Sequence, residues 1–210
     1  MTSAETATRS APTDGGLRVE HPAEGVRVLV LDRPEHRNSL DLEVFTRLAH
    51  ELALIRSDSA VRSVILTGAN GAFSSGADFA TIEYLSQLPE AEVAELLARQ
   101  MRVVDMLWAL PQPTIAAIDG PAAGAGMSLA LACDIRVGSR TMSLLPSFIR
   151  MGLVPDMGAS WLLPRLIGEG AALELLLAGR PIDPGHALRM GLVHHLSDDA
   201  LATADRKSVV

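Results

Sequence analysis

The fold is decided by residues 111–134, which read PQPTIAAIDGPAAGAGMSLALACD. A β-branched and apolar run, 114–118, ends at Asp119-Gly120-Pro121, and small residues then lead into an apolar helical run, 127–133. This order predicts a buried strand, a tight turn and the start of a helix. Glycine and alanine let the turn lie close to another group, and the free N–H groups of a helix N-terminus point towards that group.

The same turn has a plainer interpretation, which is close packing of a helix on a strand. Two nucleotide-binding motifs do not fit it. No Lys-Ser or Lys-Thr pair follows the glycines, as a phosphate loop requires, and Leu129 stands where a dinucleotide fingerprint has its third glycine. We therefore expect no nucleotide phosphate at this turn.

Composition limits the class of protein. The 210 residues, 48% of them hydrophobic, are enough for one well-filled domain. A formal charge of -7 and 3% aromatic residues argue against a nucleic-acid partner. Cys133 is the single cysteine, so neither a disulfide framework nor a zinc cluster can be built from cysteines. No apolar run reaches the ~18 residues of a membrane span, and we expect a cytoplasmic protein with no membrane contact.

The chain divides into three parts. Residues 1–17 are rich in Thr, Ser, Ala and Gly and predict a disordered leader. Strand-like and helical patterns alternate through residues 18–197, which predicts one α/β layered domain with mostly buried strands. Residues 198–210 show little apolar periodicity and are expected to form a short non-periodic tail.

Two turns of small residues carry the first functional hypothesis. Ser74 to Asp78 and Gly120 to Gly126 each follow a buried strand, so both turns can present backbone N–H groups to one point. Charge that moves onto a carbonyl oxygen is stabilised by such donors, at about 3 kcal/mol each. The pair is typical of carbonyl chemistry.

Five blocks then resemble, in order and spacing, the crotonase superfamily, which is the enoyl-CoA hydratase/isomerase family. The blocks are LDRPEHRNSL (31–40), VILTGANGAFSSGAD (64–78), PTIAAIDGPAAGAGMSLALACDIRV (113–137), FIRMGLVPDMGASWLLPRLIG (148–168) and AGRPIDPGHALRMGLV (178–193). The pattern is closest to the phenylacetate-pathway and enoyl-CoA isomerase branch. The resemblance implies a spiral of repeated ββα units, a C-terminal helical segment missing from this chain, and a trimer or dimer of trimers.

The resemblance also implies a substrate and a site. The substrate is an acyl-CoA thioester, whose coenzyme A takes the place of any separate cofactor, and no metal is expected. The oxyanion donors are the backbone N–H groups of Ser75 and Ala125. The substrate-binding positions include, besides these two, Arg37, Gly76, Ala77, Asp78 and Gly124.

The proton-transfer residues depart from those of a hydratase. Hydratases of this family use two glutamates, and the matching positions are Ser128 and Phe148. Asp156, which precedes a predicted helix, matches the acid that moves the proton in the isomerase branch, and one base suffices for a 1,3-proton shift. An N-cap for that helix is the alternative role of Asp156. An atypical hydratase and a catalytically silent or truncated acyl-CoA-binding member are the alternative functions.

Overall fold

In the computed structural model, which describes residues 15–208, six strands form one sheet in the order β1-β2-β3-β4-β6-β8. The strands are β1 Leu17–Glu20, β2 Val26–Leu31, β3 Ser63–Gly68, β4 Thr114–Ile118, β6 Ile135–Ser139 and β8 His195–Ser197. β1 runs antiparallel to β2, and every other neighbouring pair is parallel. The inner strands are buried on both faces, as their continuous apolar runs predict.

The repeated ββα unit is present. β4 is followed by β5 Pro121–Ala123 and α4 Ala125–Ala132. β6 is followed by β7 Ser143–Leu145 and, after the short helix η2 Ile149–Met151, by α5 Ala159–Ile167. β5 and β7 pair in a small parallel sheet of their own. The strand predicted over 114–118 is confirmed as β4, and α4 follows the glycine-rich turn directly.

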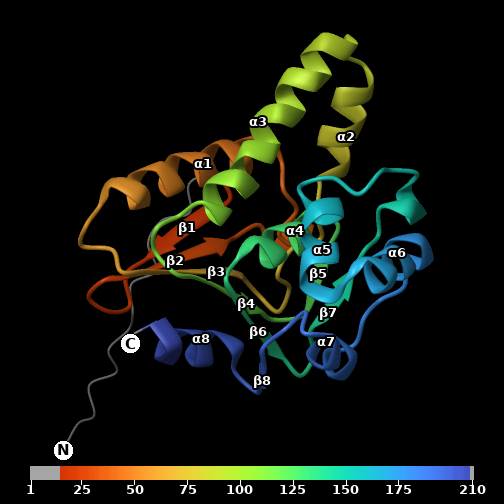
Figure 1. The fold of residues 1–210 in the computed structure, drawn as a ribbon. Coiled ribbons are helices and arrows are strands. Elements are labelled where there is room, and N and C mark those ends of the chain that lie inside the picture. The colour runs from red at the N-terminus through yellow and green to blue at the C-terminus, as the bar shows by residue number, and fades with distance from the viewer. Residues whose placement is uncertain (1–14, 209–210) are drawn as a thin grey trace, which may run out of the picture.

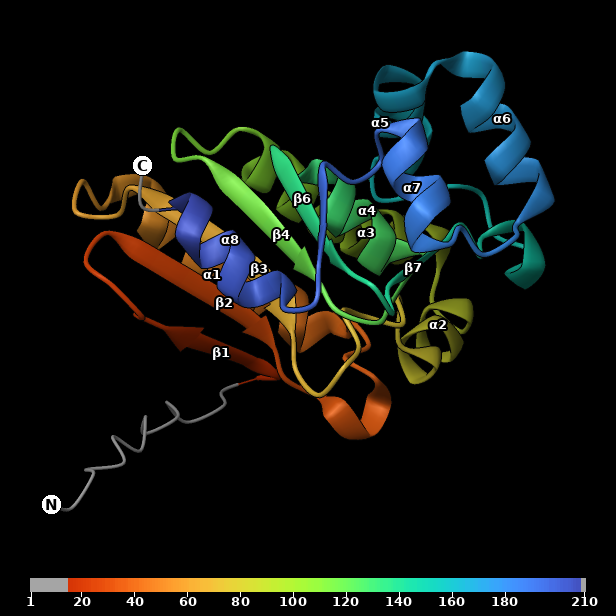
Figure 2. The same ribbon diagram turned by 90° about the horizontal axis from the view of Figure 1, so that it is seen from below.

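Helices cover one face of the large sheet. α1 Leu42–Ser57 and α3 Glu90–Trp108 pack against each other, and α4 packs against α3 and α5. Figure 1 shows α2 Phe79–Ser86 and the first half of α3 projecting together from this layer. α6 Glu169–Ala178 and α7 Pro184–Met190 form a second group beside α5 (Figure 2). None of the helices between residues 15 and 208 has the length and hydropathy needed to cross a bilayer.

The segment after residue 197, expected as a short non-periodic tail, contains a helix. α8 Ala200–Ser208 lies on the opposite face of the sheet, where it contacts β3, β4 and β6 (Figure 2). Ala200 and Ala204, four residues apart, are buried and join a cluster of strand valines and isoleucines. Two small alanines make a narrow stripe that a hydrophobicity pattern does not reveal, but they let the helix lie close to the strands.

The predicted boundary of the leader at residue 17 falls on the first residue of β1. Leu17 is 1% exposed and pairs with Leu31 as the first residue of β1. The first 14 positions of the predicted leader lie outside the described residues. A four-residue edge strand has too short an alternation to stand out from a polar segment, and its pairing with β2 depends on the tertiary structure.

Candidate active site

The two turns of small residues lie side by side because the strands before them are parallel neighbours. β3 pairs with β4 in parallel, so the segments that follow the two strands leave the sheet at the same end. Ser74 then forms a bridge to Ala122 in β5, with its carbonyl accepting from the Ala123 N–H at 2.9 Å. The Ser74 N–H donates to the Pro121 carbonyl at 3.1 Å. The predicted convergence of the turns is therefore a direct backbone contact.

Gly76 makes this approach possible. Its φ is +92°, and a Cβ at this position would stand 2.7 Å from the Ala123 carbonyl oxygen and 3.4 Å from the Ala125 nitrogen. A side chain would therefore be strained and would press into the opposite turn.

A small cavity of about 110 Å³ opens where the turns meet. The predicted site residues Ser75, Gly76, Ala77, Gly124, Ala125 and Asp156 line it, together with Phe79, Ile82, Ser147, Phe148, Met151 and Leu153. Arg37 and Asp78 do not line it. The structure therefore brings most of the predicted set together and places two members elsewhere. We call this space the reaction cavity.

The two predicted donors differ in availability. Ala125 is the first residue of α4, and its N–H has no acceptor among residues 15–208. The Ser75 N–H is already donated to the Arg37 carbonyl at 2.9 Å. The Ala77 N–H, which was not predicted as a donor, also lacks an acceptor among these residues and belongs to the same cavity wall. Ala125 is thus an open donor, whereas Ser75 is engaged.

Arg37 takes part in the site through its backbone carbonyl, which accepts from the Ser75 N–H, and not through its side chain. Its exposed side chain lies in a loop after η1 Pro34–His36, where Arg37 and Asn38 both adopt positive φ, +52° and +56°. Asn38 is 1% exposed, and its Nδ2 donates to the carbonyls of Ala69 at 2.9 Å and Ala72 at 2.7 Å. No sequence pattern singles out Asn38 as a site residue, but its side chain fastens the Arg37 loop to the turn before Ser75.

Asp78 has a structural role next to the cavity. Its carboxylate accepts from Ser39 Oγ at 2.7 Å and lies 3.5 Å from Arg33 Nη1, while its other oxygen accepts from the Ala80 N–H at the start of α2. The hydrogen bond from Ser39 is the main reason that the pKa of Asp78 is lowered. Asp78 is therefore a helix cap and an ion-pair partner.

Asp156 is not a helix cap. The N-cap of α5 is Gly158, without a side-chain cap bond, and the Ala159 N–H is donated to the main-chain carbonyl of Asp156 at 2.9 Å. The Asp156 Oδ1 atom is buried and has no partner among the described residues. Burial raises the pKa of this carboxyl above its usual value. A carboxyl with these properties is suited to exchanging a proton with a bound molecule.

The two positions that match hydratase glutamates hold no acid. Ser128 is fully buried in α4, and its Oγ lies 3.3 Å from both the Gly124 and the Asp156 main-chain carbonyls. Phe148 is buried against the reaction cavity. Among the described residues that line this cavity, Asp156 is the sole charged side chain.

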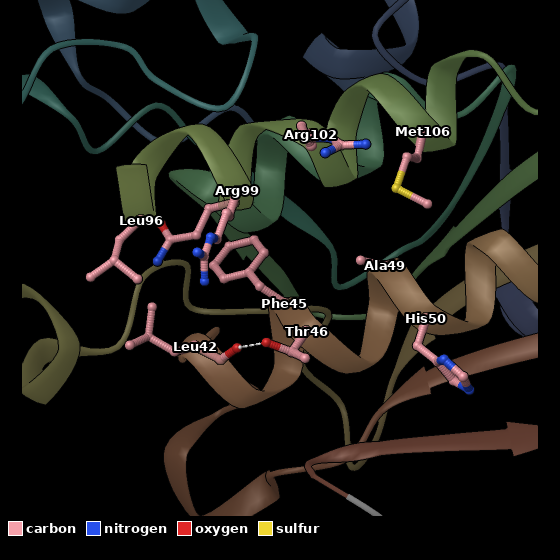
Figure 3. A pocket seen from close by; sticks show the side chains of 10 residues that line it. Leu42, Phe45, Thr46, Ala49, His50, Leu96, Arg99, Arg102 and Met106 are labelled. Carbon is pink, nitrogen blue, oxygen red and sulfur yellow. Dashed lines mark hydrogen bonds between the residues drawn. The ribbon is translucent and has the colours of Figure 1, made fainter. Parts of the chain in front are cut away.

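A larger cavity, about 460 Å³, lies between α1 and α3 and shares no lining residue with the reaction cavity. Figure 3 shows Phe45 and Leu42 of α1 facing Leu96 and Arg99 of α3 across it. Within residues 15–208, no three His, Cys, Asp or Glu side chains gather closely enough to hold a metal ion.

Known proteins resemble this chain in sequence and in fold. The sequence profile of the enoyl-CoA hydratase/isomerase family matches residues 21–208. A protein of Mycobacterium bovis named probable enoyl-CoA hydratase is 40% identical over 192 residues, which cover 89% of this chain and 67% of the relative. The 1,2-epoxyphenylacetyl-CoA isomerase of Escherichia coli is 35% identical over 182 residues, which cover 86% of this chain and 70% of the isomerase.

A solved structure resembles this chain in fold. A Thermobifida fusca protein, solved as a putative enoyl-CoA hydratase in complex with acetoacetyl-CoA, superposes with a TM-score of 0.82 at 31% identity. The match covers 93% of this chain and 78% of that one. The fold described above is therefore shared with the Thermobifida fusca protein, and the sequence places the chain among these relatives.

Proposed function

The chain belongs to the enoyl-CoA hydratase/isomerase family, and we propose that it binds an enoyl-CoA thioester and shifts its double bond through an enolate. One observation carries this proposal. The reaction cavity combines an open backbone donor, Ala125, with a single partly buried carboxyl, Asp156, whose Oδ1 atom is buried. The acetoacetyl-CoA bound to the Thermobifida fusca protein supports a thioester as the ligand.

The thioester oxygen binds at the start of α4. Removal of a proton from the carbon next to the thioester moves negative charge onto this oxygen. The Ala125 N–H donates a hydrogen bond to it, and the positive end of the α4 dipole adds to the stabilisation. A preorganised donor of this kind lowers the barrier by about 3 kcal/mol.

The Ser75 N–H joins the oxyanion site by an exchange of partners. In the structure it is donated to the Arg37 carbonyl. The substrate oxygen takes the place of that carbonyl, which requires a small movement of the Arg37 loop. The second donor is therefore formed on binding.

Asp156 moves the proton. Its carboxylate takes a proton from the carbon next to the thioester, and the electrons of that C–H bond form the enolate. The same carboxyl then returns the proton to the far end of the conjugated system, and the enolate electrons form the new double bond. Atoms and electrons balance without a co-reactant, and the raised pKa of Asp156 makes both transfers easier.

Hydration is the less favoured reaction. It requires one group to activate water and another to protonate carbon, and neither Ser128 nor Phe148 carries an acid. The Escherichia coli relative is named an isomerase and the Mycobacterium bovis relative a probable hydratase, so the preference for isomerisation rests on these side chains.

Two substrates separate the alternatives. A 3-enoyl-CoA and a 2-enoyl-CoA of the same length are incubated separately with the protein, and the products are identified by mass spectrometry. Interconversion without added mass supports isomerisation. A product from the 2-enoyl-CoA that is heavier by one water shows a hydratase instead. Binding of both esters with no product shows a silent acyl-CoA-binding protein.

We also propose that the chain forms a homo-oligomer. Exposed apolar side chains lie beside the reaction cavity, among them Phe79, Met151 and Val154, the last of which is 78% exposed. Apolar surface of this kind is covered in many oligomers. Light scattering coupled to size-exclusion chromatography would report a monomer if the proposal is wrong.

A further inference from the structure

A second cavity, about 310 Å³, continues from the reaction cavity. The two share Ala77, Ile82, Leu153 and Asp156. Beyond this shared part the walls are mostly apolar, with Leu40, Leu85, Val93, Leu97, Met101, Val154 and Met157. An apolar space that opens beside the reacting carbons is suited to an acyl chain, and we call it the acyl cavity.

Gln100 breaks the apolar character of the acyl cavity. It lies on α3, is 8% exposed and lines the cavity between Leu97 and Met101. Its Nε2 atom is buried and has no hydrogen-bond partner among residues 15–208. Two other polar side chains of this cavity, Thr81 and Ser86, are less buried, and Ser86 already donates to the Glu83 carbonyl. A buried donor without an acceptor lowers stability unless a ligand supplies one.

Gln100 stands away from the reacting end. It does not line the reaction cavity, but it does line the cavity between α1 and α3, which has no residue in common with the reaction cavity. Gln100 therefore belongs to the part of the acyl cavity that lies outside the wall shared with the reaction cavity.

We propose that Gln100 is a specificity residue that donates a hydrogen bond to an uncharged oxygen on the acyl chain, such as a ketone, ether or hydroxyl oxygen. This inference rests on the proposed function, because it assumes that the acyl cavity holds the chain of the thioester. A site built around a buried donor disfavours a chain that leaves the donor unpaired.

The charges of the acyl cavity exclude a carboxylate as the preferred group. Asp156 is its only charged side chain among the described residues, and it repels a second anion when ionised. Arg99 and Arg102 lie close to Gln100 in the sequence, but they line the cavity between α1 and α3 and do not line the acyl cavity. A carboxylate in the acyl cavity would therefore have no positive partner.

Three 3-enoyl-CoA esters of equal chain length test the inference: a plain chain, a chain with a remote ketone and a chain with a terminal carboxylate. Dissociation constants are measured by calorimetry and turnover is followed separately, for the parent and for Gln100→Leu. The parent should bind the ketone chain about tenfold more tightly than the plain chain, and the carboxylate chain least tightly. Gln100→Leu should remove the preference for the ketone while its melting temperature stays equal or rises, because the unpaired donor is gone.

The outcomes distinguish the inference from the proposed function. Equal affinity of the parent for the plain and ketone chains overturns the role of Gln100 even if both esters are isomerised. A preference that survives in Gln100→Leu also overturns it. Absence of turnover with a ketone preference that depends on Gln100 refutes the isomerase and leaves the binding role supported.

Discussion

Replacing Asp156 with asparagine gives the sharpest test of the proposed chemistry. The amide has nearly the same shape as the carboxylate but cannot take up a proton. No other charged side chain among the described residues lines the reaction cavity, so no neighbour can replace the base. We expect kcat to fall by about 10²- to 10⁴-fold, the usual contribution of a positioned base.

The same substitution should stabilise the fold at neutral pH. Burial raises the pKa of Asp156, so the folded state holds this proton more tightly than the unfolded state does. Stability of the parent therefore falls as pH rises from the ordinary aspartate pKa through the raised folded pKa. The amide of the Asp156→Asn variant does not ionise and avoids this loss. The gain should be about 1 kcal/mol, the low end of the penalty for an unsatisfied buried group, because the carboxyl is only partly buried.

Two measurements test both effects. Turnover of a 3-enoyl-CoA is followed from acidic to neutral pH, and urea unfolding is measured at pH 7 and near pH 4. Activity of the parent should rise with pH as Asp156 ionises, with its midpoint above the ordinary aspartate range. Asp105→Asn, at an exposed α3 position outside the reaction cavity, is the matched control and should change neither quantity. Parent-like kcat in Asp156→Asn would refute the one-base mechanism.

Three further predictions concern the surrounding structure. Gly76→Ala should weaken binding of a CoA ester at least tenfold and destabilise the fold by about 2 kcal/mol, because its Cβ meets the Ala123 carbonyl at 2.7 Å. Gly71→Ala is the control, since its φ of +72° is also positive but no atom lies within 4 Å of its Cβ; equal effects in the two variants would contradict the clash. Asn38→Ala should lower the free energy of unfolding by about 2 kcal/mol in urea titrations, because the buried Ala72 carbonyl and the partly buried Ala69 carbonyl lose their donor. A change below ~0.5 kcal/mol, as at an ordinary surface position, would show that these bonds are dispensable. Burial raises the pKa of the Cys133 thiol to about 12, so the folded protein should resist a thiol reagent near neutral pH and react fully in denaturant; fast labelling of the folded protein would contradict this.

Elements with strong local patterns were predictable. The run 114–118 is apolar and β-branched and forms β4, and the apolar run 127–133 lies largely in α4. The glycines of the two turns also carried information, because a positive φ or a close backbone approach favours glycine at positions such as Gly76 and Gly120. Elements at the edge and on the surface of the sheet were harder to predict from the sequence. β1 is four residues long, and α8 buries alanines rather than large side chains.

The sequence by itself determined the family, the order of the ββα units and which turns form the reaction cavity, because these follow from local patterns and from the spacing of five blocks. Only the tertiary structure decided what each group in the cavity is free to do. The Ser75 N–H is engaged by a carbonyl brought from the Arg37 loop, and Asp78 is paired with Ser39. Asp156 has a buried oxygen without a partner among the described residues because Gly158, not Asp156, is the N-cap of α5. Partners of this kind depend on segments that meet in space, so a linear pattern cannot specify them.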